Sequence, residues 1–254
     1  MEFDLSILLI GLLIATGVIS GFINTLAGGG SMLTLPALMM LGMPADVANA
    51  TNRVGVLMQS VTGVKGFDDQ DRLDRAAILP VLLPTVTGAV VGSLLASYLP
   101  VWLLKPVLLG SMVSMALVML LRPDTVAPPE GTEPYAVRDR PLAAAGLFLS
   151  GLYGGFVQAG VGFILIAALA GGLRYDLVRT NALKTVCTAV FSGVALLIFA
   201  LRGQVAWIPG MILAAGSIAG AWLSVRFAIN VGQNTLKWIL FIMVTVTCTG
   251  AIFF

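Results

Sequence analysis

The chain has 254 residues, of which 58% are hydrophobic and 10% are charged, with a formal net charge of +2 and a mean hydropathy of +1.00. This composition lies well outside that of soluble domains and excludes them as a class. We therefore expect a protein of the lipid bilayer, with no nucleic-acid partner, no cofactor and no metal.

Apolar stretches long enough to cross the ~30 Å hydrocarbon layer as helices recur along the whole chain. They predict an all-α, polytopic transmembrane protein with about eight full spans. The expected spans are residues 5–24, 46–65, 76–98, 101–121, 141–158, 176–200, 204–228 and 234–254. Two further apolar runs, 31–42 and 161–173, reach only ~18–20 Å as helices. We expect them to be half-helices or re-entrant segments.

An internal repeat with an offset of about 130 residues divides the chain into two halves. The glycine-rich stretch Gly21–Ser31 matches Gly151–Gly162. Three more pairs follow in the same order: Thr51-Asn52 with Thr180-Asn181, Gly88–Gly92 with Gly216–Gly220, and Leu104-Lys105 with Leu236-Lys237. The repeat predicts a first transmembrane repeat over residues 1–121, a linker over 122–140 and a second transmembrane repeat over 141–254.

The basic residues indicate that the two repeats have inverted topology. If each half is a span with a re-entrant return followed by three full spans, the chain enters its second half from the opposite face. One face then carries only Lys105 and Arg202, and the other carries Lys65, Arg72, Arg75, Arg122, Arg138, Arg140, Arg174, Arg226 and Lys237. If residues 5–42 instead form one broken span, the same residues divide more evenly. By the positive-inside rule, the favoured model places the linker in the cytoplasm and both termini on the extracytoplasmic side of the cell (inner) membrane.

The three remaining basic residues, Arg53, Arg179 and Lys184, fall within predicted spans. Arg53 and Lys184 lie ~10–12 Å along their spans toward the midplane, and Arg179 is shallower. The sequence has no histidine, and no carboxylate falls at that depth. A charge within a span normally faces a cavity or a partner, so we expect the substrate to be the missing partner. The alternative is that these long side chains snorkel to the membrane surface.

Polar residues accompany the cations at helical spacing and at the two glycine-rich breaks. Residues three or four apart share a helix face, and glycine lets the backbone approach a ligand. The candidate substrate-binding residues are Asn24, Thr25, Gly28, Gly29, Gly30, Ser31, Asn49, Thr51, Asn52, Arg53, Gln158, Gly160, Thr180, Asn181 and Lys184. Broken helices at matched positions of two inverted repeats indicate a binding site near the midplane.

The run Gly21–Pro36, followed by Leu41–Pro44 and Ala48–Asn52, resembles the signature of the sulfite exporter TauE/SafE family of membrane permeases. The resemblance covers essentially the full length, and the second-half stretch around Gln158 and Asn181 matches less tightly. It implies a transporter of sulfite, of sulfonates such as sulfoacetate, or of related small organic anions, often in the direction of export. Substrates vary within the family, so the resemblance does not name this one.

We expect alternating access around a midplane site, where helix N-termini and Asn or Thr groups bind the oxygens of an anion and Arg53 and Lys184 balance its charge. A passive anion channel is the alternative. An enzyme is not expected, because the lack of histidine removes the Ser-His and Cys-His pairs. The sequence does not decide how transport is coupled, since uniport, protons carried by the substrate and proton transfer through Lys184 are all compatible with it. A homo-oligomer is also compatible with the sequence.

Overall fold

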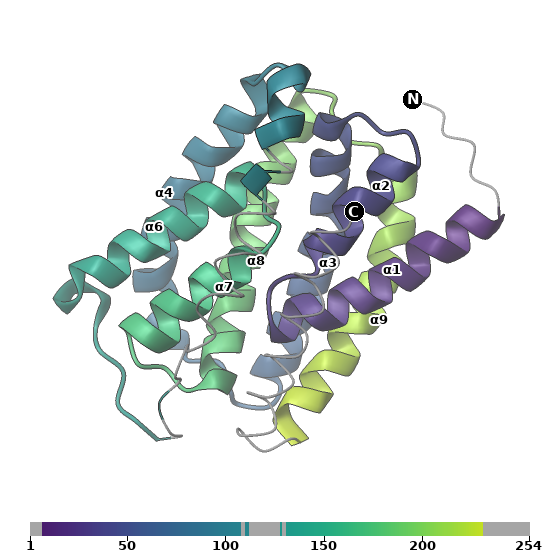
Figure 1. Cartoon of the computed structure of the whole chain (residues 1–254). Coiled ribbons are helices and arrows are strands. Elements are labelled where there is room, and N and C mark those ends of the chain that lie inside the picture. The colour runs from purple at the N-terminus through teal and green to yellow at the C-terminus, as the bar shows by residue number, and fades with distance from the viewer. Residues whose placement is uncertain (1–6, 108–109, 112–127, 129–130, 231–254) are drawn as a thin grey trace.

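The computed structural model describes residues 7–107, 110–111, 128 and 131–230 (Figure 1). The described part of the chain contains helices and no strand, which confirms the all-α class. Four of its helices are long and apolar enough to cross a membrane: α1 (Ile7–Leu26), α4 (Arg75–Tyr98), α8 (Leu177–Leu201) and α9 (Trp207–Asn230). The expected span 234–254 and most of 101–121 lie outside the described residues.

The first half of the described chain begins with two helices separated by a short break. After α1, the chain leaves the helix over residues 27–30, and α2 runs over Ser31–Met40. Gly42 follows α2 at a φ of 80°, a left-handed conformation that favours glycine and ends the helix. Helix α3 (Ala45–Asp68) begins directly after Pro44, which cannot donate a backbone hydrogen bond and suits a helix start. Helix α4 then begins after Asp74, whose carboxylate accepts a hydrogen bond from Ala77 N at 3.2 Å.

The second half repeats this order of elements. A 3₁₀ turn, η1 (Val137–Asp139), leads into α6 (Pro141–Phe156), and residues 157–160 separate α6 from α7 (Val161–Ile166). Helix α7 continues as a π-helical segment, η2 (Ala167–Gly172). Asp176 caps α8 by accepting a hydrogen bond from Arg179 N at 2.9 Å, and α9 follows. We call residues 27–30 the first break and residues 157–160 the second break.

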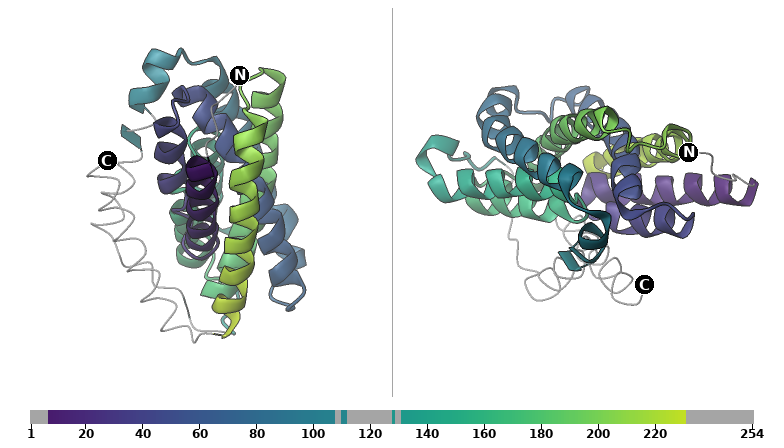
Figure 2. Two further views of the ribbon diagram at one scale, coloured as in Figure 1. Left: turned by 90° about the vertical axis from the view of Figure 1, so that its right-hand side faces the viewer. Right: turned by 90° about the horizontal axis from the view of Figure 1, so that it is seen from above.

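The short runs expected at 31–42 and 161–173 are confirmed as short helical segments, namely α2 and α7 with η2. Helix α6 is shorter than the full span expected at 141–158. It has 16 residues, which at 1.5 Å each reach ~24 Å. Both α1 and α6 run obliquely from the edge of the molecule to its centre, where the two breaks lie (Figures 1 and 2).

The helices pack in pairs that join the two halves of the chain. Helix α1 lies along α9, and α6 lies along α4 (Figure 1). These contacts are made backbone to backbone, because a Cβ added to Gly21 would overlap Ser217 O and one added to Gly151 would overlap Thr85 O. Helices α3 and α8 pack against each other between the two pairs.

At both ends of the bundle, arginine side chains lie over tyrosine rings. The α3–α4 loop, the linker residues 131–140 and the η2–α8 junction meet at one end, where Tyr135 N donates to Leu173 O at 2.9 Å. Arg140 and Arg174 flank the Tyr135 ring there, and the hydrogen bond and charge of Arg174 lower the pKa of Tyr135. At the other end, Arg202 lies over the ring of Tyr98.

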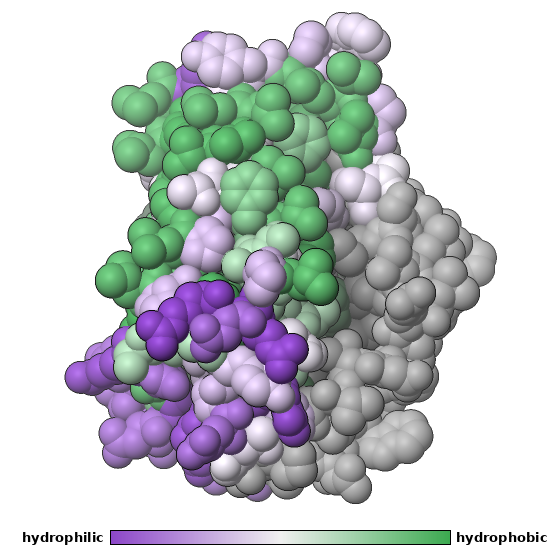
Figure 3. Space-filling model, turned by 90° about the vertical axis from the view of Figure 1, so that its left-hand side faces the viewer, coloured by the Kyte–Doolittle hydropathy of each residue, from purple (hydrophilic) through white to green (hydrophobic). Residues whose placement is uncertain are grey.

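Apolar side chains cover much of the outer surface between these ends. Figure 3 shows them over the upper part of one face, with hydrophilic side chains gathered at the lower end. On α4, Leu79 and Leu83 are 66% and 60% exposed. Such extensive exposure of large apolar side chains is unfavourable in water and suits contact with lipid.

The glycine contact between α1 and α9 gives a test of the packing. Gly21→Ala should lower the free energy of unfolding by about 1–3 kcal/mol, because the new methyl group overlaps backbone atoms that cannot move aside. Gly11→Ala is the matched control on the same helix, since nothing lies within 4 Å of its Cβ position. The measurement is the thermal unfolding temperature in detergent, and equal temperatures for the two variants would contradict the packing.

Candidate functional site

The two breaks meet at the centre of the protein. A Cβ on Gly28 would overlap Gly162 Cα, and a Cβ on Gly162 would overlap Gly28 Cα. The backbones of the first break and of the start of α7 are therefore in direct contact, which requires glycine on both sides. Gly28 and Gly160 also have φ values of 92° and 81°, which lie in the left-handed region that favours glycine.

Arg53, on α3, reaches the second break and is fully buried. Its Nη1 donates to Gly154 O and to Gln158 Oε1, and its Nη2 donates to Gly155 O at 3.0 Å. These two carbonyls lie in the last turn of α6, where carbonyl groups lack helical partners and carry the negative end of the helix dipole. The guanidinium carbon also lies 5.7 Å from the ring centroid of Phe199.

Lys184, on α8, makes the equivalent contact with the end of α1 and is 1% exposed. Its Nζ donates to Thr25 O at 2.9 Å and to Asn181 Oδ1 at 2.8 Å. Thr25 belongs to the last turn of α1, so this cation also binds the carbonyl end of a broken helix. The cation of each half thus binds the broken helix of the other half, and we call these two interactions the cation cross-contacts.

No acidic side chain is paired with either cation in the described part of the chain. The alternative that Arg53 and Lys184 snorkel to the membrane surface is not what the structure shows, because both head groups are buried against helix ends. Arg179 differs from them, because its side chain is 44% exposed and its Nε lies 3.6 Å from Asp176 Oδ2.

Several other candidate residues surround the breaks. Asn49 Nδ2 donates to Phe156 O at 2.9 Å, and Asn52 Oδ1 accepts from Thr34 Oγ1 at 2.6 Å. Gln158 is 1% exposed and has a φ of 73°, which is rare for a residue with a side chain.

Six buried polar atoms around the breaks have no hydrogen-bond partner among the described residues. They are Ser31 Oγ, Asn49 Oδ1, Asn52 Nδ2, Arg53 Nε, Gln158 Nε2 and Asn181 Nδ2. Four of the six are N–H donors, and the serine hydroxyl can also donate. A buried donor without a partner costs about 1–3 kcal/mol, so this centre is suited to a ligand rich in acceptor atoms.

The other candidate residues make contacts of a structural kind. Thr51 Oγ1 accepts from Ala206 N at 2.9 Å, ahead of the start of α9, and Thr180 Oγ1 donates to Tyr175 O at 3.2 Å. The Thr25 hydroxyl donates to Gly21 O, and the Thr25 carbonyl accepts from Lys184. A Cβ on Gly30 would overlap Ser20 O, so this glycine permits close packing. Asn24 is buried near the first break, and Gly29 O accepts from Met32 N at 3.0 Å.

The sequence interpretation missed three residues of this centre: Thr34, Ser192 and Phe199. Ser192 Oγ donates to Gln158 Oε1 at 3.1 Å, which fixes the amide that also accepts from Arg53. Thr34 lies three residues after Ser31, and Ser192 lies eight after Lys184, so helical spacing from the candidates would have found both. Phe199 lies more than a dozen residues from Lys184, and no local pattern connects it to Arg53.

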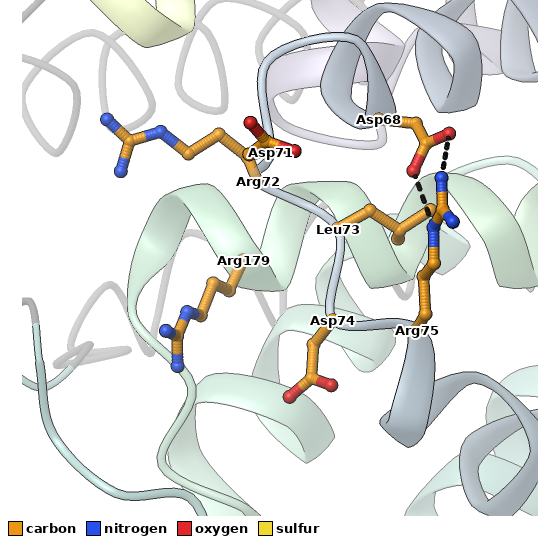
Figure 4. A pocket seen from close by; sticks show the side chains of 7 residues that line it. All are labelled: Asp68, Asp71, Arg72, Leu73, Asp74, Arg75 and Arg179. Carbon is orange, nitrogen blue, oxygen red and sulfur yellow. Dashed lines mark hydrogen bonds and ion pairs between the residues drawn. The ribbon is translucent and has the colours of Figure 1, made fainter.

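A separate polar pocket of about 570 Å³ opens at the end of the bundle that holds the α3–α4 loop (Figure 4). Its lining residues are Asp68, Asp71, Arg72, Leu73, Asp74, Arg75 and Arg179. Arg75 binds Asp68 through two nitrogens at 2.9 and 3.1 Å, and Arg72 extends away from this pair (Figure 4). Acidic and basic groups are mixed here, so the pocket has no strong preference for anions or cations.

Two helices broken at the centre of a bundle, with buried cations between them, are typical of secondary transporters. The comparisons with known proteins agree with this class. The model of the family described as sulfite exporter TauE/SafE matches residues 13–250. The chain therefore belongs to the sulfite exporter TauE/SafE family, a family of membrane transporters.

Curated relatives extend over nearly the whole chain. A probable membrane transporter protein of Haemophilus influenzae is 29% identical over 94% of this chain and 93% of its own length. The probable membrane transporter protein YfcA of Escherichia coli is 28% identical over 92% of this chain and 86% of its own length. The probable membrane transporter protein ORF9 of a Sinorhizobium species is 27% identical over 94% of this chain and 91% of its own length. No solved structure matches the chain.

Proposed function

We propose that this protein moves a small anion, such as sulfite, a sulfonate or a related organic anion, out of the cell by alternating access around the two breaks. The observation that carries the proposal is the chemistry of the buried centre. Arg53 and Lys184 are buried there without an acidic partner among the described residues, and the unpartnered polar atoms around them are mostly donors.

The charge of the centre favours an anion over a cation or a neutral solute. The carbonyl groups that now bind Arg53 and Lys184 supply only partial negative charge. Burial disfavours the charged forms of both side chains, and an opposite charge that approaches them would stabilise these forms. A sulfite or sulfonate group would supply this charge and three oxygen acceptors for donors such as Asn52 Nδ2, Gln158 Nε2 and Asn181 Nδ2.

In the proposed mechanism, both halves of the chain contribute equivalent elements to the site. We infer two inverted repeats of about 130 residues, because the second half follows the first in the order of its breaks and cations. The cation cross-contacts support this relation, because Arg53 of the first half binds the broken helix of the second half and Lys184 of the second half binds that of the first.

We further propose that the end holding the α3–α4 loop faces the cytoplasm of a cell (inner) membrane protein and that both termini lie outside. Several of the described arginines lie at that end, including Arg72, Arg75, Arg140 and Arg174. A reporter protein fused after Phe254 tests this orientation. It should be active only outside the cytoplasm, and activity inside the cytoplasm would reverse the proposed topology.

Export is the direction that the membrane potential favours. A potential that is negative inside drives a monovalent anion outward by ~2.3 kcal/mol per 100 mV. No carboxylate of the described residues contacts Arg53 or Lys184, so the proposal includes no carboxylate proton relay. A passive anion channel is the second candidate, because a channel would use the same buried cations.

Counterflow into proteoliposomes distinguishes these functions. Vesicles loaded with unlabelled sulfite should accumulate external [³⁵S]sulfite through a transporter, and the initial rate should saturate with concentration. Arg53→Met and Lys184→Met should each lower this rate about tenfold or more, because a lost charge-assisted contact costs about 1.5–3 kcal/mol. Arg179→Met is the matched control, since it removes an exposed cation from the same helix as Lys184.

Arg53→Lys and Lys184→Arg keep the charge and should retain more activity than the methionine variants, which separates loss of charge from loss of folding. Unsaturable current without counterflow would favour the channel. Full activity in both methionine variants would remove Arg53 and Lys184 from the site, and failure of sulfite, sulfoacetate and acetate alike to be transported would overturn the proposed substrate class.

A further inference from the structure

The helices group into two units that differ from the two halves of the sequence. Helix α1, from the first half, packs along α9 from the second half, and α6 packs along α4 in the same way. Helix α3 also packs extensively on α9, and α8 packs on both α4 and α3, whereas the consecutive helices α3 and α4 make little contact. We call α1, α2, α3 and α9 the first cross-repeat unit, and α4, α6, α7, η2 and α8 the second cross-repeat unit.

Close backbone packing holds each unit together. In the first unit, a Cβ on Gly216 or Gly220 of α9 would overlap the carbonyl oxygen of Ile14 or Val18 of α1. In the second unit, a Cβ on Gly88 or Gly92 of α4 would overlap a carbonyl of α6. Each pair of helices is fitted together by several successive backbone contacts of this kind, which favours movement of the pair as one body.

The contact between the two units is made mainly by side chains, with one close backbone contact at Gly28 and Gly162. It consists mainly of α3 against α8, where Thr185 of α8 lies against Gly63 of α3, and further polar side chains of these two helices, namely Gln59, Ser60 and Ser192, are buried. Gln59 Oε1 has no partner among the described residues. Both cation cross-contacts and the Gly28–Gly162 contact also join one unit to the other. Arg53, Lys184 and Gln158, which are proposed to bind the anion, therefore lie where the two units touch.

We propose that the two cross-repeat units, and not the two sequence repeats, are the bodies that move against each other during transport. This inference rests on the proposed function and goes beyond it by identifying which groups of helices move. Arg53 and Lys184 hold the units together in the present conformation. An anion that takes the cations from the carbonyl groups of α6 and α1 would release both cross-contacts and let the units separate.

Two cysteine pairs on neighbouring turns of α3 test the inference directly. The Cβ positions of Gly63 on α3 and Thr185 on α8 lie 3.9 Å apart, within the range of a disulfide, and this pair joins the two units. The Cβ positions of Gly66 on α3 and Val225 on α9 lie 3.3 Å apart, close to that range, and this pair lies inside the first unit. Both pairs join the first sequence repeat to the second.

The experiment uses the full chain with Cys187 and Cys248 replaced by alanine. G63C/T185C and G66C/V225C are oxidised in proteoliposomes, the cross-link is verified by mass, and [³⁵S]sulfite counterflow is measured before and after reduction. Oxidation should lower the counterflow rate of G63C/T185C at least about tenfold relative to its reduced form. Oxidised G66C/V225C should keep at least half of its reduced rate. G146C/A168C, whose Cβ positions lie 3.4 Å apart within one repeat and one unit, controls for oxidation itself.

Hydrogen exchange of the backbone at the two breaks supplies a readout that needs no substrate. Oxidation of G63C/T185C should slow exchange at residues 27–31 and 157–162, and oxidation of G66C/V225C should not. If both cross-links stop counterflow and slow exchange, the sequence repeats are the moving bodies. If neither does, the units do not move against each other. If sulfite is not transported by the reduced protein, the proposed function fails, and hydrogen exchange still decides the inference.

Discussion

Two basic side chains buried at the centre of an apolar helical protein are the constraint on which the rest of this structure depends. Arg53 and Lys184 need negative partners, and the chain supplies them by ending α1 and α6 at the centre, where carbonyl groups lack helical partners. Ending a helix inside the bundle requires a break, and bringing the breaks together requires glycine at positions 28 and 162. The glycines that fit α1 onto α9 and α6 onto α4 complete the arrangement.

The same arrangement leaves the centre short of acceptors. Carbonyl dipoles at helix ends satisfy hydrogen bonds of the cations without neutralising their charge. Donor atoms such as Asn52 Nδ2 and Gln158 Nε2 are buried without partners in the described residues. An oxyanion would supply both the negative charge and the hydrogen-bond acceptors that the centre lacks, which is why we favour an anion as the substrate of this member of the TauE/SafE family.

Much of the fold was predictable from local patterns in the sequence. The lengths of the apolar runs identified the short helices α2 and α7, and the glycine-rich stretches located both breaks. The depth of Arg53 and Lys184 along their helices singled them out as buried. Their partners were not predictable, because the contacts from Arg53 to Gly155 and from Lys184 to Thr25 join residues 102 and 159 positions apart. Sequence periodicity reports which face of a helix is buried, and it does not report which distant helix covers that face.

Binding of anions to the purified protein tests the central claim most directly. Thermal unfolding is followed with sulfite, sulfate, thiosulfate, sulfoacetate, acetate and small cations, for the natural chain and for the Arg53→Met variant. We predict that at least one oxyanion raises the unfolding temperature of the natural chain in a concentration-dependent manner and that the variant loses this response. Stabilisation by cations alone, or an equal response of the variant, would contradict an anion site at the two breaks.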